Sequence, residues 1–227
     1  MCFSATASFG AAALTGSAGV AAMARAYPPN ELPLAAIPLF FAVQQTCEGF
    51  LWLNLAKAPD SVFVHTLVDI FSIIALVVWP IWVPVAVGMI EPQRIRRLMI
   101  YFLLPLGAIA ALYSVVDMWR HPYTASLAAA SVCYTNRVAF PDGILTLYVL
   151  STCFPSLFSS HNDVRAFGGF VAAGLLVSTL FYTFSLISVW CFFAAIASVG
   201  IYALFRHRSE LGFEPRLALS HIGTRGR

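Results

Sequence analysis

Glu48 is the residue of this sequence best suited to chemistry, because it is the only charged residue between Glu31 and Lys57. Gln44 and Gln45 precede it by about one helical turn, so a helix here would gather the three polar side chains on one side. A carboxyl group inside an apolar segment must be protonated, paired or in contact with water. We therefore predict either a polar binding site around these side chains or hydrogen bonds from them to neighbouring helices.

Two cysteines could join Glu48 in a metal site. Cys2 precedes the first apolar segment and Cys191 lies near the start of the last one. If both segments start at the outer face of a membrane, the two thiols and Glu48 lie in the same half of the bundle. Thiolate and carboxylate ligands suit zinc or copper. The alternatives are a disulfide, a thiol site, or cysteines that serve only as small apolar packing residues.

The other cysteines carry a weaker signal. Cys133 could form a disulfide if its loop faces an oxidising compartment. We interpret Cys47 and Cys153 as packing residues. The five cysteines include no pair separated by two residues. This spacing argues against a zinc ribbon or a thioredoxin-like site.

Two pairs of residues have the four-residue spacing that brings side chains together on one helix face. His65 and Asp69 could bind a metal, relay a proton or neutralise each other, and His65 could simply lie at the membrane interface. We favour a structural role for the pair over a functional one. His161 and Arg165 follow two consecutive serines at a predicted helix start. They could bind an anionic lipid headgroup, but capping of the helix by one of the serines is the simpler expectation.

The composition places all of these residues in a membrane protein. The chain is 60% hydrophobic and only 10% charged, with a mean hydropathy of +0.83, whereas a soluble domain is roughly 25% charged. So few charges cannot cover a soluble surface. The net charge is +3, and the basic residues lie between the apolar segments and in the tail rather than in one patch. This distribution does not indicate nucleic-acid binding.

Seven apolar segments approach the ~20 residues that a membrane-spanning helix needs. The first is rich in glycine and alanine, which lets helices approach closely. The last two follow from the 40 uncharged residues between Arg165 and Arg206. As one helix these would be ~60 Å long, so we predict a turn near Thr183. The predicted segments are 3–24, 32–55, 62–90, 95–118, 143–158 and two within 166–205.

The regions between and after these segments complete the predicted all-α fold. Two prolines near the end of the third segment, Pro80 and Pro84, should kink or end its helix. The alanine-rich stretch 126–132 is predicted as a short interfacial helix. We divide the chain into a transmembrane domain, 1–205, and a basic cytoplasmic tail, 206–227.

The basic residues also predict an orientation for seven spans. Ten of them fall on one side of the membrane and three on the other. The positive-inside rule then puts the N-terminus outside and the tail in the cytoplasm. The ten are Arg25, Arg94, Arg96, Arg97, Arg165, Arg206, Arg208, Arg216, Arg225 and Arg227, and the three are Lys57, Arg120 and Arg137.

Several motifs along the chain are shared with one family. They are MCFSATASF at 1–9, ELPLAAIP at 31–38, the Gln44-Gln45 pair with Glu48-Gly49, WPIWVP at 79–84, SSH at 159–161 and SVWCFFAA at 188–195. Together they resemble a bacterial membrane protein family of unknown function, domain of unknown function 6629. The resemblance implies a multi-pass protein of the bacterial inner membrane and implies no known activity.

We expect a non-enzymatic membrane protein with a polar or metal-binding site in its outer half. It would act as a small-molecule or ion-handling component, or as an accessory subunit of a membrane complex. Its partners would be the lipid bilayer and other membrane proteins or further copies of itself. The alternatives are a membrane-embedded, metal-dependent hydrolase or oxidoreductase, which needs a water-filled cavity beside Glu48, and a purely structural subunit.

Overall fold

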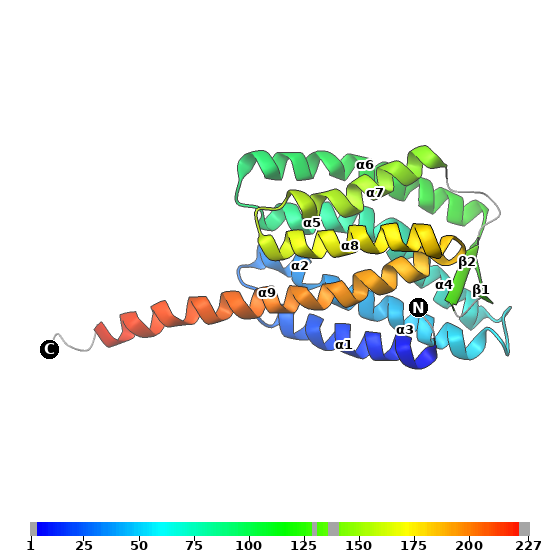
Figure 1. Cartoon of the computed structure of the whole chain (residues 1–227), viewed down its shortest axis with the longest axis horizontal. Coiled ribbons are helices and arrows are strands. Elements are labelled where there is room, and N and C mark those ends of the chain that lie inside the picture. The colour runs from blue at the N-terminus through cyan, green and yellow to red at the C-terminus, as the bar shows by residue number, and fades with distance from the viewer. Residues whose placement is uncertain (1–3, 129–130, 136–140, 223–227) are drawn as a thin grey trace.

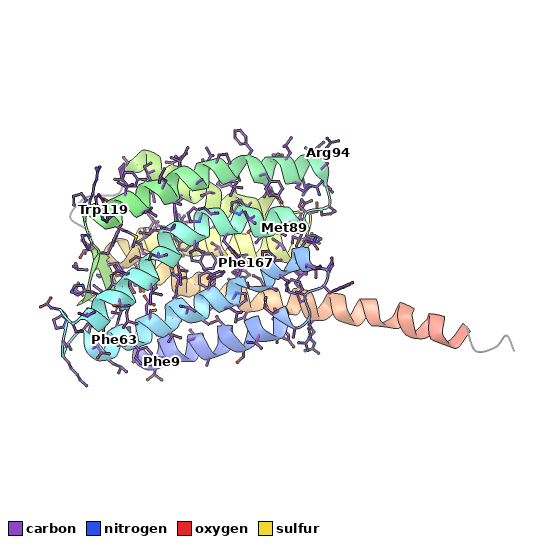
Figure 2. The ribbon with its side chains drawn as sticks, turned by 180° about the vertical axis from the view of Figure 1, so that it is seen from behind. Phe9, Phe63, Met89, Arg94, Trp119 and Phe167 are labelled. Carbon is purple, nitrogen blue, oxygen red and sulfur yellow. The ribbon has the colours of Figure 1, made fainter. Side chains whose placement is uncertain are left out.

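The computed structural model describes residues 4–128, 131–135 and 141–222. Its helices lie side by side along one direction and form a bundle, from which the end of the last helix projects (Figure 1). Met89 and Arg94 lie at one end of the bundle, while Phe9, Phe63 and Trp119 lie at the other (Figure 2). Successive helices therefore run in alternating directions, as expected for segments joined by short loops.

Most of the chain is helical. The α-helices are α1 Ala5–Met23, α2 Leu32–Ala35, α3 Ile37–Asn54, α4 Val62–Ile73, α5 Trp79–Ile90, α6 Arg94–Arg120, α7 Asp142–Phe158, α8 Asn162–Phe181 and α9 Leu186–Ile222. Three short turns of other helix types connect them, namely η1 Pro29–Glu31, η2 Ile74–Val78 and η3 Thr183–Ser185. Two strands, β1 Thr124–Ala128 and β2 Ser131–Thr135, pair as a hairpin.

Among the described residues, five helical segments are long and apolar enough to cross a membrane. They are Pro29–Asn54, Val62–Ile90, Arg94–Arg120, Asn162–Phe181 and Leu186–Arg206. Helix α7 is apolar but shorter, and the glycine-rich and serine-rich α1 is not one of the five. The predicted helical fold is thus confirmed, whereas the count of seven spans and the orientation stay predictions. The turn predicted near Thr183 is confirmed, because α8 ends at Phe181 and α9 begins at Leu186.

The third apolar segment changes its helix type ahead of the two prolines. Helix α4 passes into η2, a π-type turn at Ile74–Val78, and α5 then begins at Trp79. Pro80 stands in the first turn of α5. Proline lacks an N–H and its ring crowds the carbonyl four residues before it, so a widened turn accommodates it. The predicted disturbance therefore lies just before Pro80, and the helix continues past Pro84.

The prediction of a short helix at 126–132 is wrong. Residues 126–128 and 131–132, the part of this stretch that the structure describes, belong to an antiparallel hairpin in which Ser126 pairs with Cys133. The ring of Tyr134 stacks on Phe71 of α4 at a centroid distance of 4.3 Å. The Ser131 hydroxyl donates to that of Ser185, 2.6 Å away. These contacts of β2 with the bundle outweigh the high intrinsic helix propensity of the alanines.

Small residues bring α1 and α3 together, as the glycine-rich and alanine-rich first segment predicts. A Cβ atom added at Gly19 would lie 2.6 Å from Leu39. One added at Gly49 would lie 2.6 Å from the ring of Phe9. The two helices therefore pack closely along their length, and this contact holds one face of α3 against α1.

Candidate functional site

The central feature of the interior is a polar layer on α3. Gln44, Gln45 and Glu48 are all fully buried, with 0% of each side chain exposed. The amide nitrogen Nε2 of Gln45 donates to Glu48 Oε2 at 3.2 Å. The sequence predicted that these three side chains would lie on one side of a helix. The structure places that side in the interior.

Gln44 connects α3 to three other elements. Its Oε1 accepts a hydrogen bond from Trp79 Nε1 of α5 at 3.1 Å. Its Nε2 lies 3.5 Å from the carbonyl oxygen of Phe71 in α4 and 3.6 Å from the Cys191 sulfur of α9. One amide thus satisfies buried polar groups from several helices, which corresponds to the hydrogen-bonding interpretation of Gln44.

Replacing Gln44 with leucine should lower the free energy of unfolding by about 1 kcal/mol, because the buried Trp79 N–H loses its acceptor. The measurement is the unfolding midpoint of the purified protein in detergent. Trp79→Phe removes the donor from the same hydrogen bond, so the double variant should lose less stability than the sum of the two single variants. Full additivity would contradict a direct bond between the two side chains.

The layer also contains polar atoms whose hydrogen-bonding capacity is unused. Among the described residues, Gln45 Oε1 and Ser8 Oγ of α1 are buried and have no hydrogen-bond partner. Ser8 stands at about the level of Glu48, because the next residue, Phe9, meets α3 at Gly49. Most buried polar atoms are hydrogen-bonded to protein or ordered water. An acceptor such as Gln45 Oε1 therefore has the capacity to accept a hydrogen bond from a further donor or a water molecule, or to bind an ion.

The structure brings two of the three predicted metal ligands into the same region. Cys191 is a buried free thiol of α9, and its sulfur lies 3.6 Å from Nε2 of Gln44, which precedes Glu48 by about one turn of α3. Cys2 lies outside the described residues. Within the described part of the chain, no group of three or more His, Cys, Asp or Glu side chains could hold a metal ion. Cys133 is also a buried free thiol, beside Ser185.

His65 and Asp69 lie apart from this layer. Both side chains are exposed on α4. The buried face of that helix carries Val64, Val68 and Phe71 instead. Neither His65 nor Asp69 makes a side-chain hydrogen bond or ion pair to another described residue, although they stand one turn apart. The structure therefore does not unite the two predicted polar sites.

A second polar cluster, at the opposite end of the bundle, was not predicted. Glu91 follows α5, and only 1% of it is exposed. Its carboxylate accepts hydrogen bonds from the backbone N–H of Ser160 at 2.7 Å, from Ser159 Oγ at 3.2 Å, and from the Ser160 hydroxyl. The backbone N–H of Gln93 donates as well, at 3.2 Å. Glu91 thus joins the α5–α6 loop to the α7–α8 loop.

The hydrogen bonds determine the charge state of Glu91. Burial by itself would raise the pKa of this carboxyl group, because it disfavours the charged form. The bonds from Ser160, Gln93 and Ser159 stabilise the carboxylate, and together they hold its pKa below the ordinary value. The group is therefore ionised at neutral pH.

His161 and Arg165 belong to the same end of the bundle. His161 occupies the N-cap position of α8, but no side chain caps the helix there, so the expected serine cap is not formed. Ser159 Oγ instead accepts from the His161 backbone N–H at 3.2 Å. The His161 ring nitrogen Nε2 lies 3.2 Å from the Ile90 carbonyl oxygen, and Arg165 donates to Asn162. Headgroup binding by His161 and Arg165 stays a prediction.

Comparison with known proteins assigns a family. The sequence model of a family described as "Family of unknown function (DUF6629)" matches residues 1–215. The chain belongs to this family. No match was found among curated proteins or among solved structures. Both polar clusters of this DUF6629 protein lie within the matched region, and the resemblance noted in its motifs is confirmed.

A small cavity of about 40 Å³ adjoins the polar layer of the DUF6629 protein. It is lined by side chains of α3, α5, α7, α8 and α9, among them Trp79, Tyr148 and Cys191. Glu48 is not one of its lining residues. The hydrolase or oxidoreductase alternative, which needs a cavity beside Glu48, stays a prediction.

Proposed function

We propose that this chain is a seven-span protein of the inner membrane that binds a small cation at Glu48. The observation that carries the proposal is the pairing of Glu48 with Gln45 inside the bundle, where the amide oxygen of Gln45 has no partner among the described residues. Glu48 precedes the end of α3 by six residues, or ~9 Å of helix. With the N-terminus outside, this depth lies in the outer half of the membrane.

The chemistry of the layer favours a cation as the ligand. A carboxylate removed from water is stabilised by a positive charge close to it. The Gln45 carbonyl oxygen supplies a second oxygen donor, and the Cys191 thiol lies beside Gln44, which is about one turn of α3 from Glu48. If Cys2 joins them, the ligand set suits zinc or copper. Without the thiols, the same oxygens would hold a proton or a harder cation.

Such a site suits a protein that handles ions, or one that supplies a bound ion to a membrane complex. The protein would be surrounded by lipid, and its protein partners would be other membrane proteins or further copies of the chain. The bound cation would also join α1, α3 and α9, so ligand binding and the stability of the bundle should be coupled.

The test is metal analysis of the purified full-length protein after loading with zinc or copper. The wild type should retain the metal, and Glu48→Gln should bind it at least about tenfold more weakly. Asp69→Asn is a matched control, because it removes an exposed carboxylate on α4. Wild-type protein that binds no metal, together with an unchanged unfolding midpoint for Glu48→Gln, would refute the proposal. If Asp69→Asn alone loses the metal, the metal site would instead lie at His65 and Asp69.

A further inference from the structure

A groove lies between α8 and α9, and none of the polar-layer residues Gln44, Gln45 and Glu48 lines it. Its volume is about 780 Å³. The two helices lie side by side in the bundle (Figure 1). Apolar and small side chains line it, including Phe170, Ala173, Gly174, Phe193, Ala197 and Gly200.

The sequence of the two helices explains why the groove exists. A Cβ atom at Gly174 would lie 3.0 Å from the Cβ of Phe193, so the backbones approach closely at this point. Beyond it, the lining residues Ala173, Ala197 and Gly200 are too small to fill the space between the helices. The lining of α8 extends from Asp163 to Val177, which is ~21 Å of helix.

A single charge marks one end of this apolar groove. Asp163 lines it in the first turn of α8, and the side chain is exposed. Asp163 makes no side-chain hydrogen bond or ion pair with a described residue. The nearest cation along the helix is Arg165, which stands ~200° further around the axis and donates to Asn162 instead. The carboxylate is therefore available to a ligand that lies in the groove.

We propose that this groove binds a phospholipid whose headgroup carries an amine, with an acyl chain along α8 and α9 and the ammonium group at Asp163. The proposal rests on α8 and α9 crossing the membrane, as proposed above, but not on the Glu48 site. One leaflet of hydrocarbon is ~15 Å thick, so a groove of ~21 Å accommodates one chain and the start of its headgroup. The negative charge stands at the end where the headgroup would lie.

A transmembrane helix fits the groove less well than a lipid does. A helix about 10 Å wide and ~21 Å long occupies about 1,600 Å³, roughly twice the volume of the groove. A helix would therefore rest on the rim of the groove, with the space beneath it unfilled. Extended hydrocarbon chains are narrower and can follow the small residues of α9.

The experiment is native mass spectrometry of the full-length protein mixed with equal amounts of phosphatidylethanolamine and phosphatidylglycerol. The wild type should retain the amine-bearing lipid about fivefold more than the other. Asp163→Asn should abolish this preference. Gly200→Leu should reduce the binding of both lipids, because a side chain at Gly200 projects into open space within the groove.

Two matched control variants distinguish lipid binding in the groove from general effects of adding a leucine or removing a carboxylate. A Cβ atom at Gly169 also meets nothing within 4 Å, yet Gly169 does not line the groove. Gly169→Leu should therefore bind lipid as the wild type does, and so should Asp142→Asn, in the first turn of α7. Unchanged preference in Asp163→Asn, or unchanged binding in Gly200→Leu, would overturn the proposal. So would a dimer mass that Gly200→Leu abolishes, because a second copy would then fill the groove.

Discussion

Replacing Gly107 with alanine is expected to destabilise the bundle by about 3 kcal/mol or more. Gly107 lies in the middle of α6, where a Cβ atom would stand 1.8 Å from the carbonyl oxygen of Pro80 and 3.0 Å from the Ser151 Cβ. The first obstacle is backbone, so it cannot rotate away as a side chain can. Relief requires α5 and α6 to separate. The unfolding midpoint in detergent measures the loss.

Gly169→Ala is the matched control for this prediction. Gly169 is also a helical glycine, but a Cβ atom added there meets nothing within 4 Å. Alanine has the higher helix propensity, so this variant should be as stable as the wild type or up to about 1 kcal/mol more stable. If Gly107→Ala has the same unfolding midpoint as the wild type, α5 and α6 do not approach as closely as described.

The contrast between these two glycines shows where prediction from sequence ends. Hydropathy predicted the apolar helices, and the excessive length of 166–205 predicted the turn before α9. These features depend on composition along the chain. The role of Gly107 depends on where α6 crosses α5, and the sequence contains 14 glycines that hydropathy does not distinguish. The same reason explains the hairpin, since the pairing of β2 and its contact with Phe71 are tertiary.

Glu48 and Glu91, which are both almost fully buried, differ in the same way. Glu48 was predicted because a lone charge within an apolar segment needs a physical reason. Glu91 falls between the predicted segments 62–90 and 95–118, where a solvated loop is expected. Its burial depends on Ser159 and Ser160, which lie nearly 70 positions further along the chain. Without that contact, Glu91 has the same sequence signature as a solvated loop residue.

Replacing Glu91 with glutamine is expected to lower the free energy of unfolding by about 2 kcal/mol at neutral pH. A carboxylate accepts all the surrounding donors, whereas an amide presents its own N–H₂ group to one side of them. Hydrogen bonds to a charged partner contribute about 1.5–3 kcal/mol. The donors of Ser159, Ser160 and Gln93 would then be incompletely satisfied at a buried position. Unfolding midpoints of the two proteins at pH 7 measure the difference.

The pH dependence of this stability difference tests whether the Glu91 carboxylate causes it. The pKa of Glu91 is lowered in the folded protein, and the unfolded value is about 4.3. The stabilisation is therefore complete above the unfolded pKa and is lost as the pH falls through the folded pKa. The difference in the free energy of unfolding between the wild type and Glu91→Gln should stay constant from pH 7 to about 5. It should become smaller below about pH 4.

Two further variants test whether this effect belongs to the connection between the loops. Ser160→Ala removes one hydroxyl donor but keeps the backbone N–H, so it should cause part of the loss and leave the acid dependence in place. Asp142→Asn changes an exposed carboxylate in the first turn of α7 and should change neither stability nor its pH profile by more than about 0.5 kcal/mol. A gap between wild type and Glu91→Gln that persists unchanged into acid would mean that the glutamine disturbs packing. The Glu91 charge would then have no part in holding the two loops together.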